Sequence, residues 1–298
     1  MTRAMTLPTL RDAPLAVIAP PSAEASALVF DSPHSWPHWP ADVPTIAPPE
    51  ALRTSCDAWI DELWAGAIDG RAPLLAARFH RSYIDANRAS DDIDPALLAG
   101  PWPGPLNPGD RSRRGFGLLR RLALPGVPVY AQPLSVRDVQ RRLEHFYRPY
   151  HDRLAELIDA AAERHGAVLH VNCHSMKSVG TAMNEDAGRP RPDIVLSDLD
   201  GRSAGPGILE CMAVPLRECG YRVQLNDPYR GEEILRRHGR PALGRHSVQI
   251  ELKRSLYMDE QQFVRHEGFR HLIADLRGCF GRWEREFGAM AHAGRRPP

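Results

Sequence analysis

The chain has 298 residues, of which 43% are hydrophobic, enough for an extensive core in one large domain or two small ones. Lysine and arginine total 38 and aspartate and glutamate 37, so the net charge of +1 excludes a global field that attracts nucleic acid, anionic membrane or acidic polymer. The five cysteines form no C-x-x-C pair, no 18 apolar residues run together, and proline and charge interrupt the N-terminus before a signal-peptide core can build up. We therefore expect a soluble, cytoplasmic protein without nucleic-acid or membrane partners.

Residues 1–26 are rich in proline and lack periodicity, which predicts an irregular N-terminal arm before a single catalytic domain at 27–290. Within that domain, apolar runs typical of strands alternate with amphipathic segments typical of helices. The predicted elements are strand 27–32, helix 55–70, strand 72–79, helix 135–166, strand 167–175, strand 191–198, helix 205–220, strand 221–227, strand 245–252 and helix 259–287. The alternation predicts an α/β fold, a three-layer sandwich in which helices flank a central, mostly parallel mixed sheet.

Two places interrupt this pattern. Residues 91–114, with GPWPGPLNPGD at their centre, are too long for an ordinary connection and indicate a functional loop. Pro149 stands inside the long helical stretch 135–166 and predicts a kink or break there, because proline lacks the N–H that a helix interior needs.

Two histidines follow strand-like runs, His34 in FDSPHS and His174 in VNCHS. Ligands of open α/β sheets bind outside the carboxyl ends of the strands, so both imidazoles are expected in one crevice. Either histidine alone is more often a hydrogen-bonded loop residue than a metal ligand. Two imidazoles and a carboxylate, however, make a three-ligand zinc site with an open position for water. Glu251 ends the run SVQIEL and is then a candidate general base.

Five motifs appear in the order and approximate spacing of the N-formylglutamate amidohydrolase family: DSPHS, ARFHRSYIDANR, VNCHSM, LNDPYRG and VQIELKRSLYMDE. The chain resembles this family from about Leu28 to Trp283. The resemblance implies a zinc-dependent exopeptidase-like α/β fold of the phosphorylase/hydrolase type, related to carboxypeptidases and cell-wall amidases. It also implies hydrolysis of a small-molecule substrate, N-formyl-L-glutamate, to formate and glutamate, late in histidine degradation.

The resemblance further implies the metal ligands. Related amidases place an acidic ligand at the beginning of the helix after the first histidine, where this chain has Asp57. We therefore expect His34, Asp57 and His174 to hold one zinc ion. Asp57 is also a plausible N-cap or first-turn acid of that helix. Asp61, one turn further on, is the alternative ligand, and Glu62 is expected to face solvent.

A glutamate substrate brings two carboxylates, each of which a planar guanidinium can bind through two hydrogen bonds. Carboxypeptidases use a similar Asn-Arg pair for the terminal carboxylate, so the resemblance assigns Asn87 and Arg88 to substrate binding. Arg81 and Asp85, four residues apart, are interpreted as a structural pair that supports this loop.

A second binding candidate lies in the motif LNDPYRG. Arg230 is a candidate for the distal carboxylate, with a surface turn as the competing interpretation. Tyr229 beside it is a candidate donor of a hydrogen bond to the amide oxygen of the substrate.

The chain departs from the family pattern at four positions. Trp36 and Ser197 replace glycine, His80 replaces a small hydroxyl residue, and Glu232 replaces a second glycine. These changes leave the metal and base residues in place but bear on the substrate. The alternatives are therefore an amidase for another N-acyl amino acid or peptide, and an inactive homologue that binds an amino-acid-like ligand. The sequence gives no oligomeric state.

Overall fold

The computed structural model describes residues 15–18, 26–181, 184 and 186–293. The chain divides into two compact units: the first comprises Val17–Ser32, Trp59–Ala76 and Arg153–Pro298, and the second Met1–Ala16, Pro33–Ala58 and Ala77–Asp152. Most of the predicted N-terminal arm lies outside the described residues, although Leu15–Ile18 within it forms a strand, β1. The organisation as a single catalytic domain stays a prediction.

A seven-stranded sheet organises the first unit, although Leu15, Ala16 and Ala77, at the ends of two of its strands, fall in the second unit. Its strands are β1 (Leu15–Ile18), β2 (Leu28–Ser32), β3 (Leu74–Ala77), β6 (Val168–Met176), β7 (Ile194–Ser197), β8 (Val223–Leu225) and β9 (Arg245–Lys253), in the order β1-β3-β2-β6-β9-β7-β8. The pairs β2–β3, β2–β6, β6–β9 and β7–β8 are parallel, and β7–β9 is antiparallel. The mostly parallel mixed sheet expected from the sequence is thus confirmed.

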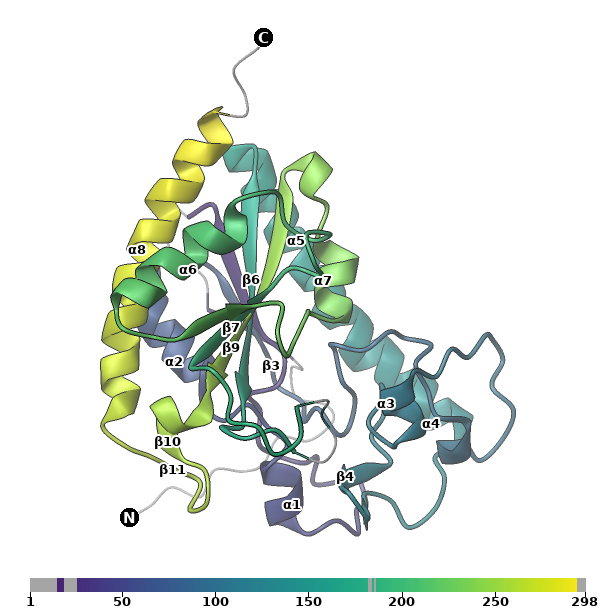
Figure 1. The fold of residues 1–298 in the computed structure, drawn as a ribbon. Helices are drawn as coiled ribbons and strands as arrows, with labels where there is room; N and C mark the ends of the chain where they lie inside the picture. Colours follow the sequence, from purple (N-terminus) through teal and green to yellow (C-terminus); the bar gives the residue numbers. More distant parts are fainter. Residues whose placement is uncertain (1–14, 19–25, 182–183, 185, 294–298) are drawn as a thin grey trace, which may run out of the picture. The chain divides into compact units, whose positions relative to one another are not determined.

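Helices cover both faces of this sheet. They are α2 (Ile60–Ile68), α5 (Arg148–His165), α6 (Ile208–Glu218), α7 (Glu233–His238) and α8 (Gly268–Ala293). In Figure 1, α2, α6 and α8 lie on one side of the sheet, and α7 and most of α5 on the other. The apolar residues of α2 recur at the helical spacing that buries one face, and its Trp64 ring lies 5.2 Å from Phe30 of β2 and 6.2 Å from Trp283 of α8.

The second unit has little regular structure. Its elements are α1 (Pro49–Arg53), the hairpin of β4 (Leu122–Leu124) and β5 (Val127–Pro128), α3 (Asp110–Arg113) and α4 (Val136–Arg142), with a 3-10 turn at Pro95–Leu97. An aromatic cluster supplies part of its core, in which the Phe146 ring packs edge-on against Phe79 and Tyr83. The guanidinium of Arg142 is buried over the Tyr83 ring and donates to the Tyr83 carbonyl.

Two predicted helices begin later in the structure than expected. The helix expected at 55–70 begins only at Ile60, because Trp59 has a left-handed backbone with a φ of 59°, so the proposed N-cap role of Asp57 is wrong. The helix expected at 259–287 begins at Gly268, because a hairpin of β10 (Met258–Asp259) and β11 (Val264–Arg265) precedes it. Short 3-10 turns at Pro241–Leu243 and Arg254–Leu256 flank β9.

The kink expected at Pro149 takes the form of a π-helical turn. Residues Leu143–Tyr147 form this turn between α4 and α5, immediately before the proline. Proline cannot donate the next backbone hydrogen bond of an α-helix, so a local change of helical pattern at this place is expected. The turn bears on the candidate site, because Tyr147 reaches the loop that carries Arg88.

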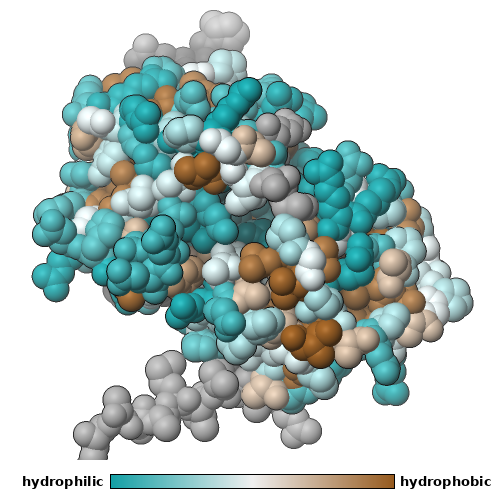
Figure 2. Space-filling view, turned by 60° about the horizontal axis from the view of Figure 1, so that its bottom comes forward, coloured by the Kyte–Doolittle hydropathy of each residue, from teal (hydrophilic) through white to brown (hydrophobic). Residues whose placement is uncertain are grey.

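No helix among the described residues is long and apolar enough to cross a membrane. Hydrophilic side chains cover most of the face shown in Figure 2, where hydrophobic ones form small, separate groups. The large hydrophobic side chains that are exposed in the described part of the chain are Ile46, Val179, Leu243, Val264 and Met290. Isolated exposures of this kind are normal on protein surfaces.

Candidate functional site

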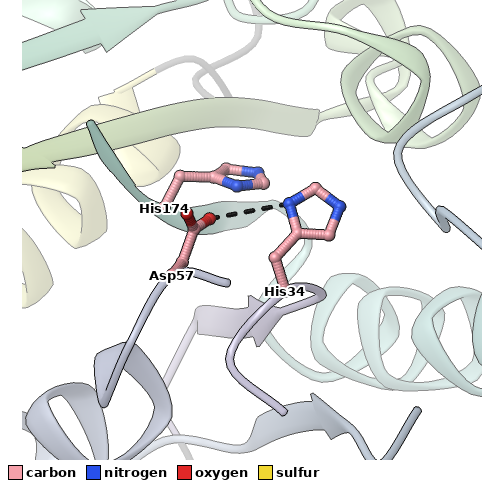
Figure 3. A group of neighbouring side chains, drawn as sticks. All are labelled: His34, Asp57 and His174. Atoms are coloured by element: carbon pink, nitrogen blue, oxygen red, sulfur yellow. Dashed lines mark ion pairs between the residues drawn. The ribbon is translucent and has the colours of Figure 1, made fainter. Parts of the chain in front are cut away.

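His34, Asp57 and His174 form a buried group in which one potential ligand atom from each residue lies within 4.8 Å of the others. His34 lies in the loop after β2, Asp57 in the loop before α2, and His174 within β6, and their side chains point toward one another (Figure 3). The 3.5 Å between His34 Nδ1 and Asp57 Oδ2 is close to the roughly 3.4 Å between two ligands of a tetrahedral zinc ion. The group could therefore hold a metal ion.

Hydrogen bonds fix which nitrogen of each histidine faces this group. His34 Nε2 lies 2.6 Å from Asp85 Oδ1, and His174 Nε2 lies 2.7 Å from Asn172 Oδ1. Both partners are acceptors, so each Nε2 carries the proton and donates it. The lone pair of each neutral ring is then on Nδ1, the form that a metal ion binds.

Asp85 connects His34 to the neighbouring arginines. Its Oδ1 also accepts from the backbone N–H of Asn87 at 2.9 Å, and its Oδ2 accepts two hydrogen bonds from Arg81 at 2.9 and 3.2 Å. Burial alone raises the pKa of Asp85, but the charge of Arg81, the hydrogen bond from His34 and the charge of Arg88 hold it well below its usual value. The expected Arg81–Asp85 pair is confirmed, and the sequence analysis missed that Asp85 also orients His34.

Positive charge exceeds negative charge around Asp85. Arg88 is buried, and the guanidinium of Arg120, whose side chain is 11% exposed, lies 3.8 Å from Asp85 Oδ2. Burial and repulsion from Arg81 lower the pKa of Arg120 to about 9. Among the described residues, the Arg120 Nε atom has no hydrogen-bond partner. No signal in the sequence marks Arg120, because an Arg-Arg pair beside a turn cannot be told from a solvated surface pair.

The loop that carries Asn87 and Arg88 is held from the long helix. Tyr147 of the π-helical turn donates its hydroxyl to the Arg88 carbonyl at 2.8 Å, and His151 of α5 donates Nε2–H to the Ala86 carbonyl at 3.0 Å. The Tyr147 and His151 rings contact each other, with centroids 4.4 Å apart. Both donors act on backbone carbonyls and thereby hold the backbone of the loop.

One face of the β6–β9 ladder is polar. In the parallel register His170 pairs with Ser247, Asn172 with Gln249 and His174 with Glu251. Alternate residues of a strand point to the same face, so these six side chains share one face and the apolar residues between them occupy the other. Glu251 thus lies beside His174, and it accepts a hydrogen bond from Gln249 Nε2 at 3.0 Å. The alternation is visible in VLHVNCHS and SVQIEL, so the polar residues that accompany His174 and Glu251 on this face could have been recognised from the sequence.

The two candidates of the motif LNDPYRG lie in different surroundings. The Tyr229 ring packs against the buried guanidinium of Arg191, 5.0 Å from its centroid, and Arg191 also interacts electrostatically with Glu251. The Arg230 side chain is 70% exposed and lies 3.9 Å from Asp200. The structure therefore brings Tyr229 and Glu251 to one arginine that the sequence analysis did not single out, and places Arg230 at the surface.

Two departures from the family pattern are explained by packing. His80 is fully buried, donates Nε2–H to the Leu52 carbonyl at 3.2 Å and accepts from the Ser82 N–H at Nδ1, and burial lowers its pKa to about 3. Its ring lies 5.8 Å from that of Trp39. Trp36 packs instead under the guanidinium of Arg78, at 4.8 Å.

Comparison with known proteins identifies the family. Residues 26–258 match the family described as N-formylglutamate amidohydrolase. The N-formylglutamate deformylases of Pseudomonas putida and Pseudomonas aeruginosa are 31% and 30% identical to this chain, over 69% and 78% of it and over 72% and 84% of their own lengths.

Solved structures agree with this match. The crystal structure of N-formylglutamate amidohydrolase from Ralstonia eutropha JMP134 has 42% sequence identity and a TM-score of 0.84, covering 95% of this chain and 99% of that one. The gene product Atu2144 from Agrobacterium tumefaciens shares the fold, at 21% identity and a TM-score of 0.63 over 92% and 95% of the two chains. By sequence and by structure, the chain belongs to the N-formylglutamate amidohydrolase family.

Proposed function

We propose that this protein hydrolyses N-formyl-L-glutamate to formate and L-glutamate, using one zinc ion held by His34, Asp57 and His174. The observation that carries the proposal is this buried group of two imidazoles and a carboxylate in a chain of the amidohydrolase family. Zinc bound there supplies Lewis acidity, which polarises the amide carbonyl and makes water more acidic. The named relatives at about 30% identity are deformylases of this substrate.

We assign to Glu251 the two proton transfers of the reaction, from the attacking water and to the leaving nitrogen. Its place in register with His174 puts its carboxylate on the same face of the sheet as that ligand. It accepts the proton of the attacking water as the water oxygen adds to the formyl carbon. It then delivers this proton to the glutamate nitrogen as the carbon–nitrogen bond breaks.

We propose that arginines bind the two carboxylates of the substrate. Asn87 and Arg88 are proposed to bind the α-carboxylate, in a loop whose backbone is anchored by Tyr147 and His151. For the distal carboxylate, the buried Arg120 joins the exposed Arg230 as a candidate, and the excess positive charge around Asp85 favours Arg120. Tyr229 is proposed to donate to the amide oxygen.

The metabolic setting that we propose is histidine degradation in the cytoplasm, where glutamate is released from a formylated intermediate. All five cysteines are free thiols, which supports a reducing compartment. The composition and charge of the chain support a small-molecule substrate as its partner.

The test combines elemental analysis of the purified protein with a formate-release assay. We expect about one zinc per chain, and formate release from N-formylglutamate that a chelator abolishes and added zinc restores. His34→Ala should lose both the metal and the activity, whereas His38→Ala, in the same loop, should keep both. Zinc without formate release would refute the proposed substrate. A protein that has neither bound zinc nor activity would instead indicate an inactive ligand-binding homologue.

A further inference from the structure

A chain of hydrogen bonds runs through the polar face of the sheet and ends at His174. Ser247 Oγ lies 2.7 Å from His170 Nδ1, and His170 Nε2 lies 2.9 Å from Asp31 Oδ1. Asn172 Nδ2 donates to the same Asp31 oxygen at 2.8 Å, and Asn172 Oδ1 lies 2.7 Å from His174 Nε2. All five residues are at least 97% buried, so water has little access to these bonds.

The carboxylate of Asp31 sets the direction of every bond in this chain. A carboxylate only accepts, so His170 must donate Nε2–H and its Nδ1 must accept from the Ser247 hydroxyl. Asn172 must turn its amide NH₂ toward Asp31, which leaves its carbonyl oxygen facing His174. His174 Nε2 must then carry the proton, and the lone pair is on Nδ1.

Without this constraint the side chain of Asn172 has two orientations of nearly equal shape. The rotated amide would present NH₂ to His174 Nε2, which would have to accept, and the proton would move to Nδ1. A protonated Nδ1 is not a metal ligand. The orientation of one amide therefore decides whether His174 offers a lone pair to the group that it forms with His34 and Asp57.

We propose that Asp31 is a positioning residue of the metal centre, which acts through Asn172 to fix the metal-binding tautomer of His174. The strand register brings the two residues together, since Asp31 of β2 pairs with Asn172 of β6. The inference rests on the proposed function for the identity of the metal, but the tautomer itself can be measured in the metal-free protein.

The first measurement is the nitrogen NMR spectrum of histidine in the zinc-free protein, near pH 8, with His174→Gln used to assign the signal. We expect the wild-type His174 to carry its proton on Nε2, and Asp31→Ala to populate the Nδ1-protonated form. Zinc affinity, measured by competition with a chelator, should fall about tenfold to hundredfold in Asp31→Ala. Asp31→Asn should lie between the two, because its amide oxygen can still accept from Asn172.

Ser247→Ala is the matched control, since it removes the far end of the same chain and leaves Asp31 as the acceptor of Asn172. It should keep the wild-type tautomer and zinc affinity. Circular dichroism and thermal unfolding establish that each variant is folded. If Asp31→Ala does not fold, Asn172→Ala breaks the next link and should weaken zinc binding similarly.

A folded Asp31→Ala or Asn172→Ala protein with wild-type zinc affinity overturns the proposal, as does a wild-type His174 protonated on Nδ1. A wild-type protein that binds no zinc refutes the proposed metal centre instead. The NMR comparison of wild type and Asp31→Ala still decides the positioning role in that case.

Discussion

Asp85 and Glu251 are two buried carboxylates beside the histidines of the candidate metal centre, and their surroundings give them different capabilities. Asp85 accepts from His34 and from the guanidinium of Arg81, and its pKa lies well below the usual value, so it stays ionised at neutral pH. Glu251 accepts from the neutral amide of Gln249 and also interacts electrostatically with the buried Arg191. The contacts of Asp85 suit it to orienting His34, whereas the proposed mechanism assigns the proton transfers to Glu251.

Glu251→Gln tests this division of roles. The substitution preserves shape but cannot accept a proton, so kcat should fall about 10²- to 10⁴-fold while zinc content and thermal unfolding stay near wild type. Formate release and elemental analysis provide the measurements. Glu156→Gln, at a side chain that is 63% exposed, should leave kcat unchanged. A Glu251→Gln enzyme with normal turnover would remove Glu251 from the mechanism.

Arg88→Lys and Arg120→Lys test carboxylate recognition. Each should lower kcat/KM for N-formylglutamate by an amount equivalent to about 2–4 kcal/mol, the scale of a broken buried charged hydrogen bond, with zinc content unchanged. N-formylglutamine lacks the distal carboxylate, so Arg120→Lys should affect it far less than Arg88→Lys does. If Arg230→Lys shows this substrate-dependent loss and Arg120→Lys does not, the distal carboxylate binds at Arg230.

At the scale of elements, the junction before α2 determines which acid lies in the candidate metal-binding group. Because α2 begins at Ile60, Asp57 stays in the preceding loop, where its backbone N–H donates to the His34 carbonyl at 2.9 Å. That bond ties together the two loops that carry potential ligands. Asp61 lies in the first turn of the helix instead.

Parallel substitutions at this junction distinguish the two acids. Asp57→Ala should lose most of its bound zinc, whereas Asp61→Ala should keep it, because Asp57 supplies the carboxylate oxygen of the buried group. Elemental analysis after dialysis against a weak chelator provides the comparison. The reverse result would move the ligand one helical turn along the chain.

At the scale of the whole molecule, the sequence predicts the sheet well because buried parallel strands appear as apolar runs between turns, as in 27–32 and 167–175. Both histidines of the candidate metal centre and Glu251 could be singled out because each ends or follows such a run. The pair of Asp85 with Arg81 was expected, but the contact of Asp85 with His34 and the position of Arg120 were not, because they depend on contacts between loops, which no local periodicity encodes. The late start of α8 was missed because the hairpin before it lacks a typical turn sequence.

The pH dependence of stability also belongs to this scale. The neutral His80 uses both ring nitrogens, and protonation would place a proton on Nδ1, which faces the Ser82 N–H. Its pKa is about 3 in the folded protein, against the 6.5 of an ordinary histidine, so the unfolded chain binds the proton more readily. This contribution to stability is complete above pH 6.5 and is lost as the pH falls toward 3.

Urea unfolding between pH 7.5 and about pH 4.5 measures this effect. The free energy of unfolding should fall by up to about 1.4 kcal/mol for each pH unit below the pKa of His80 in the unfolded chain. His80→Gln keeps hydrogen-bonding groups but does not titrate, so its free energy of unfolding should fall less steeply over the same range. Equal slopes for the two proteins would show that His80 does not couple stability to pH.

The surplus of guanidinium groups around Asp85 has a consequence for engineering and for evolution. Repulsion among Arg81, Arg88 and Arg120, which lie close together in the interior, lowers the stability of the fold. The same positive charge makes this region favourable for binding an anion. Selection for heat resistance alone would favour the loss of one of these charges, and Arg120 is the most weakly held of them by Asp85. If Arg120 binds the distal carboxylate as proposed, such a variant would survive heating better but bind dicarboxylates less selectively, so screens for robust catalysts of this family should score turnover alongside melting temperature.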